Sequence, residues 1–433
     1  AMLTALLLAA CSQVAEVPTE ETQLESAATT PGSLDTTFKK SLNGFGGGGG
    51  FATQMATLPN GKTIVVFELW SSNDVAAPGF QQFIVVRRYN EDGSHDRTFG
   101  GAGNTQATIR GFLPNLTPQD LVVTPEGRIF IAATGRSFSA VRPFIFALTP
   151  SGTFDSSFDG NGSLSPATTI ANSSTNKISA ADLSYDPATK KLTLGGTIEP
   201  KSGSNSFLWT YTVDANNTNS PKETVVKESG ANLEMEKLEK LSNGEFLMAA
   251  GITPASGGGI PRGYLVRQID NGIIVRKAIN VVGFETFIHG LKVDGNKVFL
   301  AGSAFTSGST TQGYVARFDL ETLTKDTTFG NQGIRFVGNE VRDIAFSKGT
   351  GTAQKILVAG TDGTDYLVAR MAYNGAIDTA FGKNGIALVN FSNAVDERAL
   401  TLSVDGKNRI WAAGLTEPFN DGGFRAGIFR LVP

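Results

Sequence analysis

The tetrapeptide Asp326-Thr327-Thr328-Phe329, followed by Gly330, is one copy of a phrase that recurs along the chain. The other copies are Asp35-Thr-Thr-Phe38, Asp96-Arg-Thr-Phe99, Asp155-Ser-Ser-Phe158 and Asp378-Thr-Ala-Phe381. Their aspartates are separated by 61, 59, 171 and 52 residues, and 171 is three intervals of 57, so we expect two degenerate copies inside the long gap. A near-constant period of this size indicates stacked supersecondary units.

Each interval between phrases contains the same series of short apolar runs. An alternating run enters a tight turn, as in 399–406, and a second run leaves the turn and ends near Ala-Gly, as in 355–360. A third run such as 366–371 leads to the phrase, and a short run such as 333–337 follows it. Alternation broken by glycine-containing turns predicts four antiparallel strands per unit and no helix.

The turn after the first strand allows the units to be counted. Seven such turns are present, at Asn60-Gly61, Glu126-Gly127, Thr189-Lys190, Asn243-Gly244, Asp294-Gly295, Lys348-Gly349 and Asp405-Gly406. Four-stranded units repeated radially form a β-propeller, in which blades pack around a central channel. The sequence therefore predicts an all-β, seven-bladed propeller.

The two ends of the chain are expected to complete one blade together. The last unit, 425–433, stops where the other units continue into the phrase and a fourth strand, and residues 32–51 hold that missing piece. We expect residues near 44 to 53 to pair as the outer strand of the C-terminal blade, so that an N-terminal strand closes the ring.

These phrases resemble a known family. GSLDTTF (32–38), GSHDRTFG (93–100) and KDTTFGNQG (325–333), together with the LVAG and VARF runs, resemble the delta-sixty repeat, a bacterial propeller module. The resemblance covers residues 32–433 and weakens near Asp214 and Asp270, where the phrase decays. It implies a propeller fold and export, without a defined activity.

The N-terminus predicts processing and anchoring. The apolar run 3–10 is too short to span a bilayer and ends in Leu8-Ala9-Ala10-Cys11, which resembles the lipobox of bacterial lipoproteins. We expect residues 1–10 to be a signal peptide, Cys11 to be lipidated, 11–31 to be a flexible acidic tether and 32–433 to be a single propeller domain. An ordinary signal peptide with an incidental cysteine is the alternative.

The charge composition argues against nucleic acid as a binding partner. With 37 basic against 40 acidic residues and a net charge of −3, the chain has no basic field for nucleic acid. We expect a monomer on the outer side of the bacterial cell membrane or on the outer membrane, with a protein or glycan partner.

Aligning the seven first strands on their turns brings polar residues together at one mouth of the channel. The aligned positions are Gln54, Asp120, Asp182, Lys237, His289, Asp343 and Ala399. Asp120, Asp182, His289 and Asp343 are the candidates for binding a cation or a polar ligand, because converging carboxylates repel unless a positive group lies among them. Ca²⁺ is the cation considered, and no other cofactor is indicated. The alternative is that each aspartate caps local backbone donors.

A second recurrence is structural. Arg88, Arg267, Arg317, Arg370 and Arg430 end the third strands, and four of them precede an Asp-x-x-Phe phrase. We expect an ion pair between each arginine and the phrase's aspartate, although Ala147 breaks the rule and Arg267 lacks a phrase.

The sequence leaves the activity open. Only His95 and His289 are present, and no phosphate loop or metal-binding cysteine motif occurs, so no catalytic residue is nominated. The leading hypothesis is a membrane-anchored, non-catalytic binding or scaffold propeller. The alternatives are a polysaccharide-active enzyme and a subunit of an envelope assembly complex.

Overall fold

The computed structural model describes residues 30–38, 41–43, 48–72, 80–101, 105–110, 113–166, 177–201, 205–255, 262–269, 272–279, 285–305, 310–391, 394–418 and 423–433. Within these ranges the secondary structure is strand, apart from one 3-10 turn, η1 (Gly351–Ala353). The predicted signal peptide, Cys11 and almost all of the tether lie outside the described residues. The all-β prediction is confirmed.

The strands form antiparallel sheets of four, taken here in chain order. The first contains β2 (Gly50–Thr57), β3 (Thr63–Trp70), β4 (Gln82–Tyr89) and β5 (Ala107–Ile109). The second contains β6 (Asn115–Val123), β7 (Ile129–Arg136), β8 (Val141–Leu148) and β9 (Ser163–Leu164). A parallel bridge between Gln82 and Asn115 joins these two units into one eight-stranded sheet.

The next units repeat this order. The third contains β10 (Lys177–Asp186), β11 (Lys191–Glu199), β12 (Phe207–Asp214) and β13 (Asn217–Val226). The fourth contains β14 (Ala231–Lys240), β15 (Phe246–Pro254), β16 (Arg262–Ile269) and β17 (Gly272–Ile279). The fifth contains β18 (Thr286–Asp294), β19 (Lys297–Phe305), β20 (Thr311–Asp319) and β21 (Ile334–Phe336).

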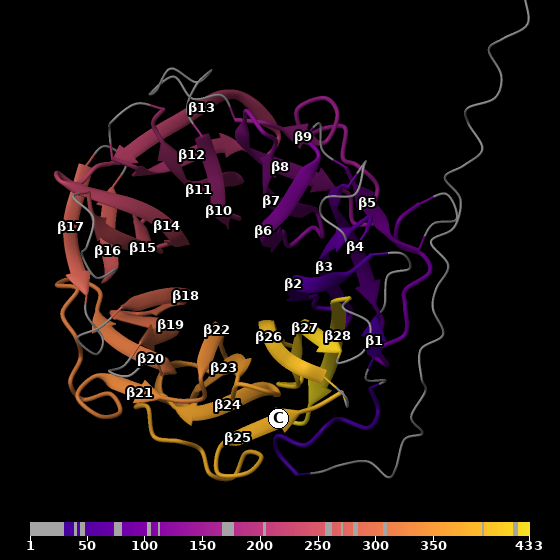
Figure 1. The fold of residues 1–433 in the computed structure, drawn as a ribbon, viewed down its shortest axis with the longest axis vertical. Coiled ribbons are helices and arrows are strands. Elements are labelled where there is room, and N and C mark those ends of the chain that lie inside the picture. Colours follow the sequence, from indigo (N-terminus) through magenta and orange to yellow (C-terminus); the bar gives the residue numbers. More distant parts are fainter. Residues whose placement is uncertain are drawn as a thin grey trace, which may run out of the picture.

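The last two units complete the described chain. One contains β22 (Glu340–Phe346), β23 (Lys355–Thr361), β24 (Tyr366–Ala372) and β25 (Ile386–Val389). The other contains β26 (Ala394–Val404), β27 (Ile410–Pro418), β28 (Arg425–Leu431) and β1 (Ser41–Asn43). In Figure 1 the units stand around a central space, with the first strand of each one innermost.

The N-terminal strand pairs with the C-terminal unit, but not at the predicted residues. β1 pairs with β28 from Ser41 opposite Ile428 to Asn43 opposite Ala426, before the expected stretch of 44–53. Of that stretch, 44–47 lie outside the described residues and 50–53 pair with β3 instead. Residues 50–57 form β2, which pairs with β3, and Ala52 and Met55 are buried against the neighbouring sheet.

The seven inner strands share one irregularity. Each has a register shift, a β-bulge, after its second to sixth residue, at which one extra residue is inserted. We call the residues that follow the bulges the ring positions; they are Gln54, Asp120, Asp182, Lys237, Gly290, Asp343 and Thr401. The bulge bends each inner strand at the same depth and sets the direction of the side chains that follow.

The residue after each ring position builds the core. All seven are apolar, and they are Met55, Leu121, Leu183, Leu238, Leu291, Ile344 and Leu402. Each packs with residues of the preceding sheet, as Leu183 does with Phe130 and Ile344 does with Phe299. The core therefore lies between neighbouring sheets, and burial of these side chains orients the inner strands.

The recurrent phrase serves as a clamp between sheets. The predicted arginine–aspartate pairs are confirmed at Arg88–Asp96 (2.6 Å), Arg317–Asp326 (3.1 Å), Arg370–Asp378 (3.1 Å) and Arg430–Asp35 (2.8 Å). The guanidinium groups also donate to carbonyl oxygens of the next unit, as Arg88 does to Pro150 at 2.6 Å. Where Ala147 breaks the rule, Arg128, the residue before β7, supplies the cation to Asp155 at 2.7 Å.

Candidate ligand-binding cavity

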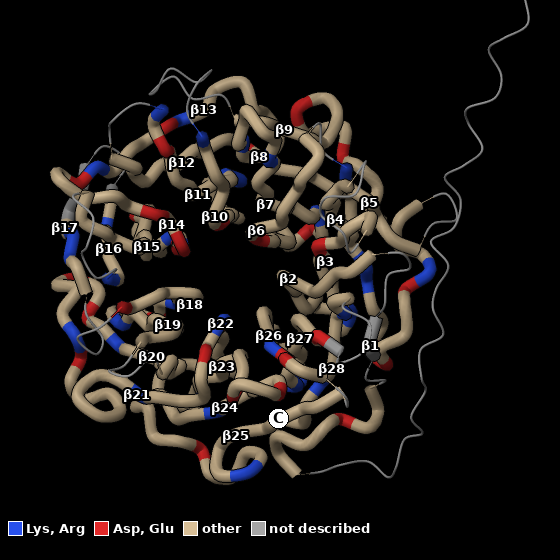
Figure 2. Tube along the Cα trace, in the orientation of Figure 1, with Lys and Arg blue, Asp and Glu red and all other residues tan. Residues whose placement is uncertain are grey.

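The central space contains a cavity of about 1070 Å³, which the second halves of all seven inner strands line. Asp120, Asp182 and Asp343 line it, as the sequence predicted, and His289 does not. Figure 2 shows acidic and basic residues close together along β6, β10, β14 and β18, whereas β2 carries no charge. The cavity is therefore polar and asymmetric.

The three aspartates bind backbone groups of the next inner strand. Asp120 accepts a hydrogen bond from the Leu183 N–H at 2.9 Å, and Asp182 accepts one from the Leu238 N–H at 2.6 Å. Asp343 accepts one from the Leu402 N–H at 2.8 Å. The alternative, capping of local backbone donors, holds only for Asp343, which also accepts from the Ile344 N–H; the other donors belong to the neighbouring sheet.

The carboxylates of Asp120 and Asp182 are balanced by Lys237, the ring residue of β14. The Lys237 ammonium lies 3.4 Å from Asp182 Oδ1. Burial and the adjacent Asp182 charge raise the pKa of Asp120 well above its usual range. Burial alone would lower the pKa of Lys237, but Asp182 and Asp120 raise it above its ordinary value. Lys237 thus remains charged and supplies the positive group that converging carboxylates require.

No group of three or more histidine, cysteine, aspartate or glutamate side chains within the described ranges has an arrangement that could hold a metal ion. The geometry instead places an ammonium group among the aspartates, which favours a polar ligand over a bare cation at this point.

His289 occupies the bulge of β18, and Gly290 holds the ring position. Its Nε2 lies 3.2 Å from Ser303 Oγ and 3.8 Å from Glu340 Oε1. Burial lowers the pKa of His289 to about 3, with Arg342 and Lys237 acting in the same direction, so the ring is neutral. The sequence alignment was off by one residue because the turn between β18 and β19 has only two residues.

The alignment of the seventh unit was off by two residues, since Thr401 and not Ala399 holds the ring position. The residue with positive φ in that turn is Asn408 (φ 63°), where we had counted from Gly406. Asparagine tolerates the left-handed region well, so aligning this unit on Asn408 instead of Gly406, two residues earlier, moves the aligned position from Ala399 to Thr401.

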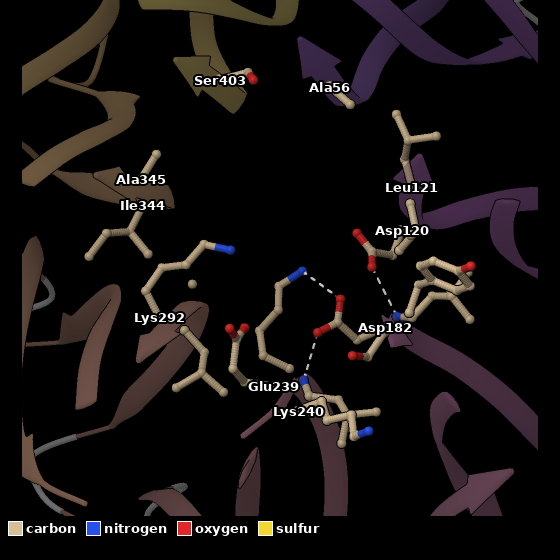
Figure 3. A pocket seen from close by; sticks show the side chains of 18 of the residues that line it. Ala56, Asp120, Leu121, Asp182, Glu239, Lys240, Lys292, Ile344, Ala345 and Ser403 are labelled. Atoms are coloured by element: carbon tan, nitrogen blue, oxygen red, sulfur yellow. Dashed lines mark hydrogen bonds and ion pairs between the residues drawn. The ribbon is translucent and has the colours of Figure 1, made fainter. Parts of the chain in front are cut away.

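The sequence analysis did not single out five charged residues that line the cavity. Asp186 and Lys240 pair with each other and Lys348 is exposed, which leaves two others to consider. Glu239 of β14 and Lys292 of β18 stand two residues beyond their ring positions, and Figure 3 shows both side chains in the cavity. The equivalent residues on the other strands are small or apolar, namely Ala56, Val122, Ser184, Ala345 and Ser403. Extending the alignment by two residues would have found the pair.

The side chains of Glu239 and Lys292 have no direct polar partner in the protein. Neither side chain makes a hydrogen bond, or an ion pair within 4 Å, with any residue that the structure describes. Burial raises the pKa of Glu239, and Glu239 is the main cause that raises the pKa of Lys292. The two groups therefore interact across a gap wider than a direct ion pair.

Aromatic rings complete the wall. Tyr185 and Phe346 line the cavity. Tyr185 stacks on Phe130 with ring centroids 6.4 Å apart, and Phe346 packs edge-on against Phe299 at 5.1 Å. These contacts cross between sheets and fix both rings in place.

The described part of the chain contains no helix with the length and apolarity needed to cross a membrane.

The comparisons with known proteins address the fold. No protein-family model and no curated protein matches the chain. Among solved structures, a protein of unknown function from Dyadobacter fermentans aligns with a TM-score of 0.51 at 11% identity, covering 89% of this chain and 95% of that one. The polysaccharide lyase Uly1 aligns with a TM-score of 0.50 at 8% identity, covering 88% and 90%.

The β-propeller domain of the Trilobed protease from Pyrococcus furiosus also aligns, with a TM-score of 0.44 at 10% identity, covering 89% of this chain and 98% of that domain. At these identities the similarity to the solved structures extends to the fold alone.

Proposed function

We propose that this protein is a seven-bladed propeller of the cell envelope that binds a polar ligand in its central cavity without catalysing a reaction. The observation that supports this proposal is that some charged side chains of the cavity are bound by the protein itself and others are not. The ring aspartates are each engaged by a backbone N–H, while Glu239 and Lys292 remain available to a ligand.

The proposal of seven blades and a closed ring rests on two features of the strands. Seven inner strands carry the same bulge, and β1 supplies the outer strand that the C-terminal unit lacks. The phrases that resemble the delta-sixty repeat supply the clamps between neighbouring blades.

We place the protein outside the cytoplasm as a monomer, held to the membrane by acyl chains on Cys11. Residues 12–31 would act as the tether between the lipid and the propeller. Metabolic labelling with a palmitate analogue tests this part. We expect label on the full chain, none on Cys11→Ser, and release of that variant from membranes. Equal labelling of both proteins would contradict the anchor.

One observation favours the enzymatic alternative, in which the cavity acts on a polysaccharide. The pKa of Asp120 is raised beside the second carboxyl of Asp182, and paired carboxyl groups of this kind can serve as acid and base. Release of reducing ends from a polysaccharide panel, lost in Asp120→Asn, would replace binding by catalysis as the function.

The binding proposal is tested by thermal melting of the purified full chain with a panel of cell-envelope solutes, Ca²⁺ and EDTA. A ligand at 100 times its Kd that binds only the folded state adds about 2.7 kcal/mol to its stability. β2 lies across the central space from β18 (Figure 1), and Ala56 of β2 lines the cavity, so Ala56→Trp should narrow the cavity and reduce the shift. If no solute raises the melting temperature, or if the shift is unchanged in Ala56→Trp, the proposal that this cavity binds the ligand is contradicted.

A further inference from the structure

The unpaired charges of Glu239 and Lys292 identify the chemistry of the ligand. Both residues lie two positions beyond the bulge on neighbouring inner strands, β14 and β18, and both side chains line the cavity. In Figure 3 they stand side by side, with no dashed line from either one to another side chain.

The distance between the Glu239 carboxylate and the Lys292 ammonium leaves room for a ligand group that binds both. The ammonium and the carboxylate lie more than an ion-pair distance apart, yet Glu239 is the main cause of the raised pKa of Lys292. A carboxylate only accepts hydrogen bonds and an ammonium only donates them. A hydroxyl group does both, so adjacent hydroxyls of one ligand can donate to Glu239 and accept from Lys292.

The charge balance disfavours a charged ligand. An anion would meet Glu239, Asp343 and Asp182, and a cation would meet Lys237 and Lys292. Because the charges of both signs are partly buried, an added unpaired charge would carry a desolvation cost that no partner compensates. A neutral ligand with many hydroxyls satisfies both signs at once.

The remaining wall also suits such a ligand. Ser184 and Ser403 add hydroxyls at the same depth, and Tyr185 and Phe346 add apolar ring surface. A cavity of about 1070 Å³ is at the upper end of the range for small-molecule sites, large enough for more than one sugar ring.

We propose that the cavity binds a neutral saccharide whose adjacent hydroxyl groups bridge the Glu239 carboxylate and the Lys292 ammonium. This inference rests on the proposed function of the cavity as a ligand site, and it names the ligand class and the two residues that select it.

The test is calorimetric titration of the full chain with neutral disaccharides (maltose, cellobiose, lactose), a diuronate and a chitosan dimer. We expect a neutral disaccharide to bind at least about tenfold more tightly than the charged analogues, because a hydrogen bond to a charged group contributes that much. Lys292→Met and Glu239→Gln should each weaken binding about tenfold or more, and the double variant should lose less than the sum, since one bridge serves both.

Lys348→Met is the matched control, because Lys348 also lines the cavity but at its exposed rim, and it should leave binding unchanged. The melting temperatures of the unliganded variants show whether each one folds, and Lys292→Gln replaces any variant that does not.

The inference is overturned if no disaccharide binds, if the diuronate or chitosan dimer binds more tightly, or if Lys348→Met matches Lys292→Met. A solute of another class that shifts the melting temperature, with the shift reduced in Ala56→Trp, would leave the cavity's binding function standing and remove only the saccharide.

Discussion

Arg430 and Asp35 lie 395 positions apart and form an ion pair in which Arg430 Nε is 2.8 Å from Asp35 Oδ2. The Arg430 guanidinium lies over the rings of Phe38 and Trp411, at 5.0 and 5.2 Å, and only 1% of its side chain is exposed. This buried pair links the first described segment to the last strand.

Asp35→Ala should therefore destabilise the protein strongly. Removing one partner of a buried ion pair leaves the other charge uncompensated, which costs about 3–5 kcal/mol. Urea unfolding followed by tryptophan fluorescence measures the effect, since Trp411 lies beside Arg430. The control is Lys177→Ala, which breaks the exposed 3.9 Å pair with Glu199 and should cost less than about 1 kcal/mol. Equal losses would show that the Asp35 pair is not a clamp.

Glu68 makes the stability depend on pH near neutrality. It is 6% exposed on β3, and burial raises its pKa from 4.5 to about 7. Between these values the folded protein holds a proton that the unfolded chain has released, so stability falls as pH rises from about 4.5 to 7.

Glu68→Gln removes this titration and should raise stability at pH 8 by up to about 3 kcal/mol, with little change at pH 4. Gln82 Nε2 donates to Glu68 Oε1 at 3.2 Å, and the glutamine oxygen can accept the same bond. Denaturant unfolding at pH 4, 6 and 8 measures the effect. Parallel stability curves for the wild type and the variant would contradict it.

The repeat period was sufficient to predict the sheets, because alternation and turn residues are local signals that each unit repeats. Placing side chains around the cavity needed the alignment between units to be correct to one residue. It was correct at Asp120, Asp182 and Asp343 and wrong at His289, because a two-residue turn shifts the count.

Other features depend on contacts between segments that are distant in the sequence. Arg128, which replaces the arginine missing at Ala147, stands in the turn between β6 and β7 and reaches Asp155 only in the folded unit. The backbone partners of the aspartates in the next sheet are more distant still, so the sequence left the ligand and capping interpretations both open.

One of the Ala-Gly ends of the second strands, Ala359-Gly360 on β23, predicts a steric requirement. Gly360 stands opposite the bulge of β22, and a Cβ there would overlap the Glu340 carbonyl group. We expect Gly360→Ala to cost about 2 kcal/mol or more, since overpacked sites are destabilised by about 1–3 kcal/mol. Gly251→Ala on β15 is the control, because a Cβ at that position meets nothing within 4 Å. Thermal melting compares the two variants, and equal midpoints would exclude a steric role for Gly360.

Variants of Asp343 can distinguish a structural role of the ring positions from a role in ligand binding. One of its oxygens accepts the Leu402 N–H at 2.8 Å and the other accepts the Ile344 N–H at 2.7 Å. Asp343→Ala leaves the Leu402 N–H without this partner and should cost about 1–3 kcal/mol.

Asp343→Asn keeps an oxygen for the Leu402 N–H and removes a carboxylate whose pKa is raised by burial. A raised pKa means that the charged form is less favourable in the folded protein, so the charge lowers stability as pH rises above the ordinary range of aspartate. Asp343→Asn should therefore match or exceed the wild type in stability at pH 8, as measured by thermal melting, and should retain ligand binding in the cavity. If Asp343→Asn folds normally but loses all binding, the carboxylate contacts the ligand directly, and its link to the next sheet is the lesser of its two roles.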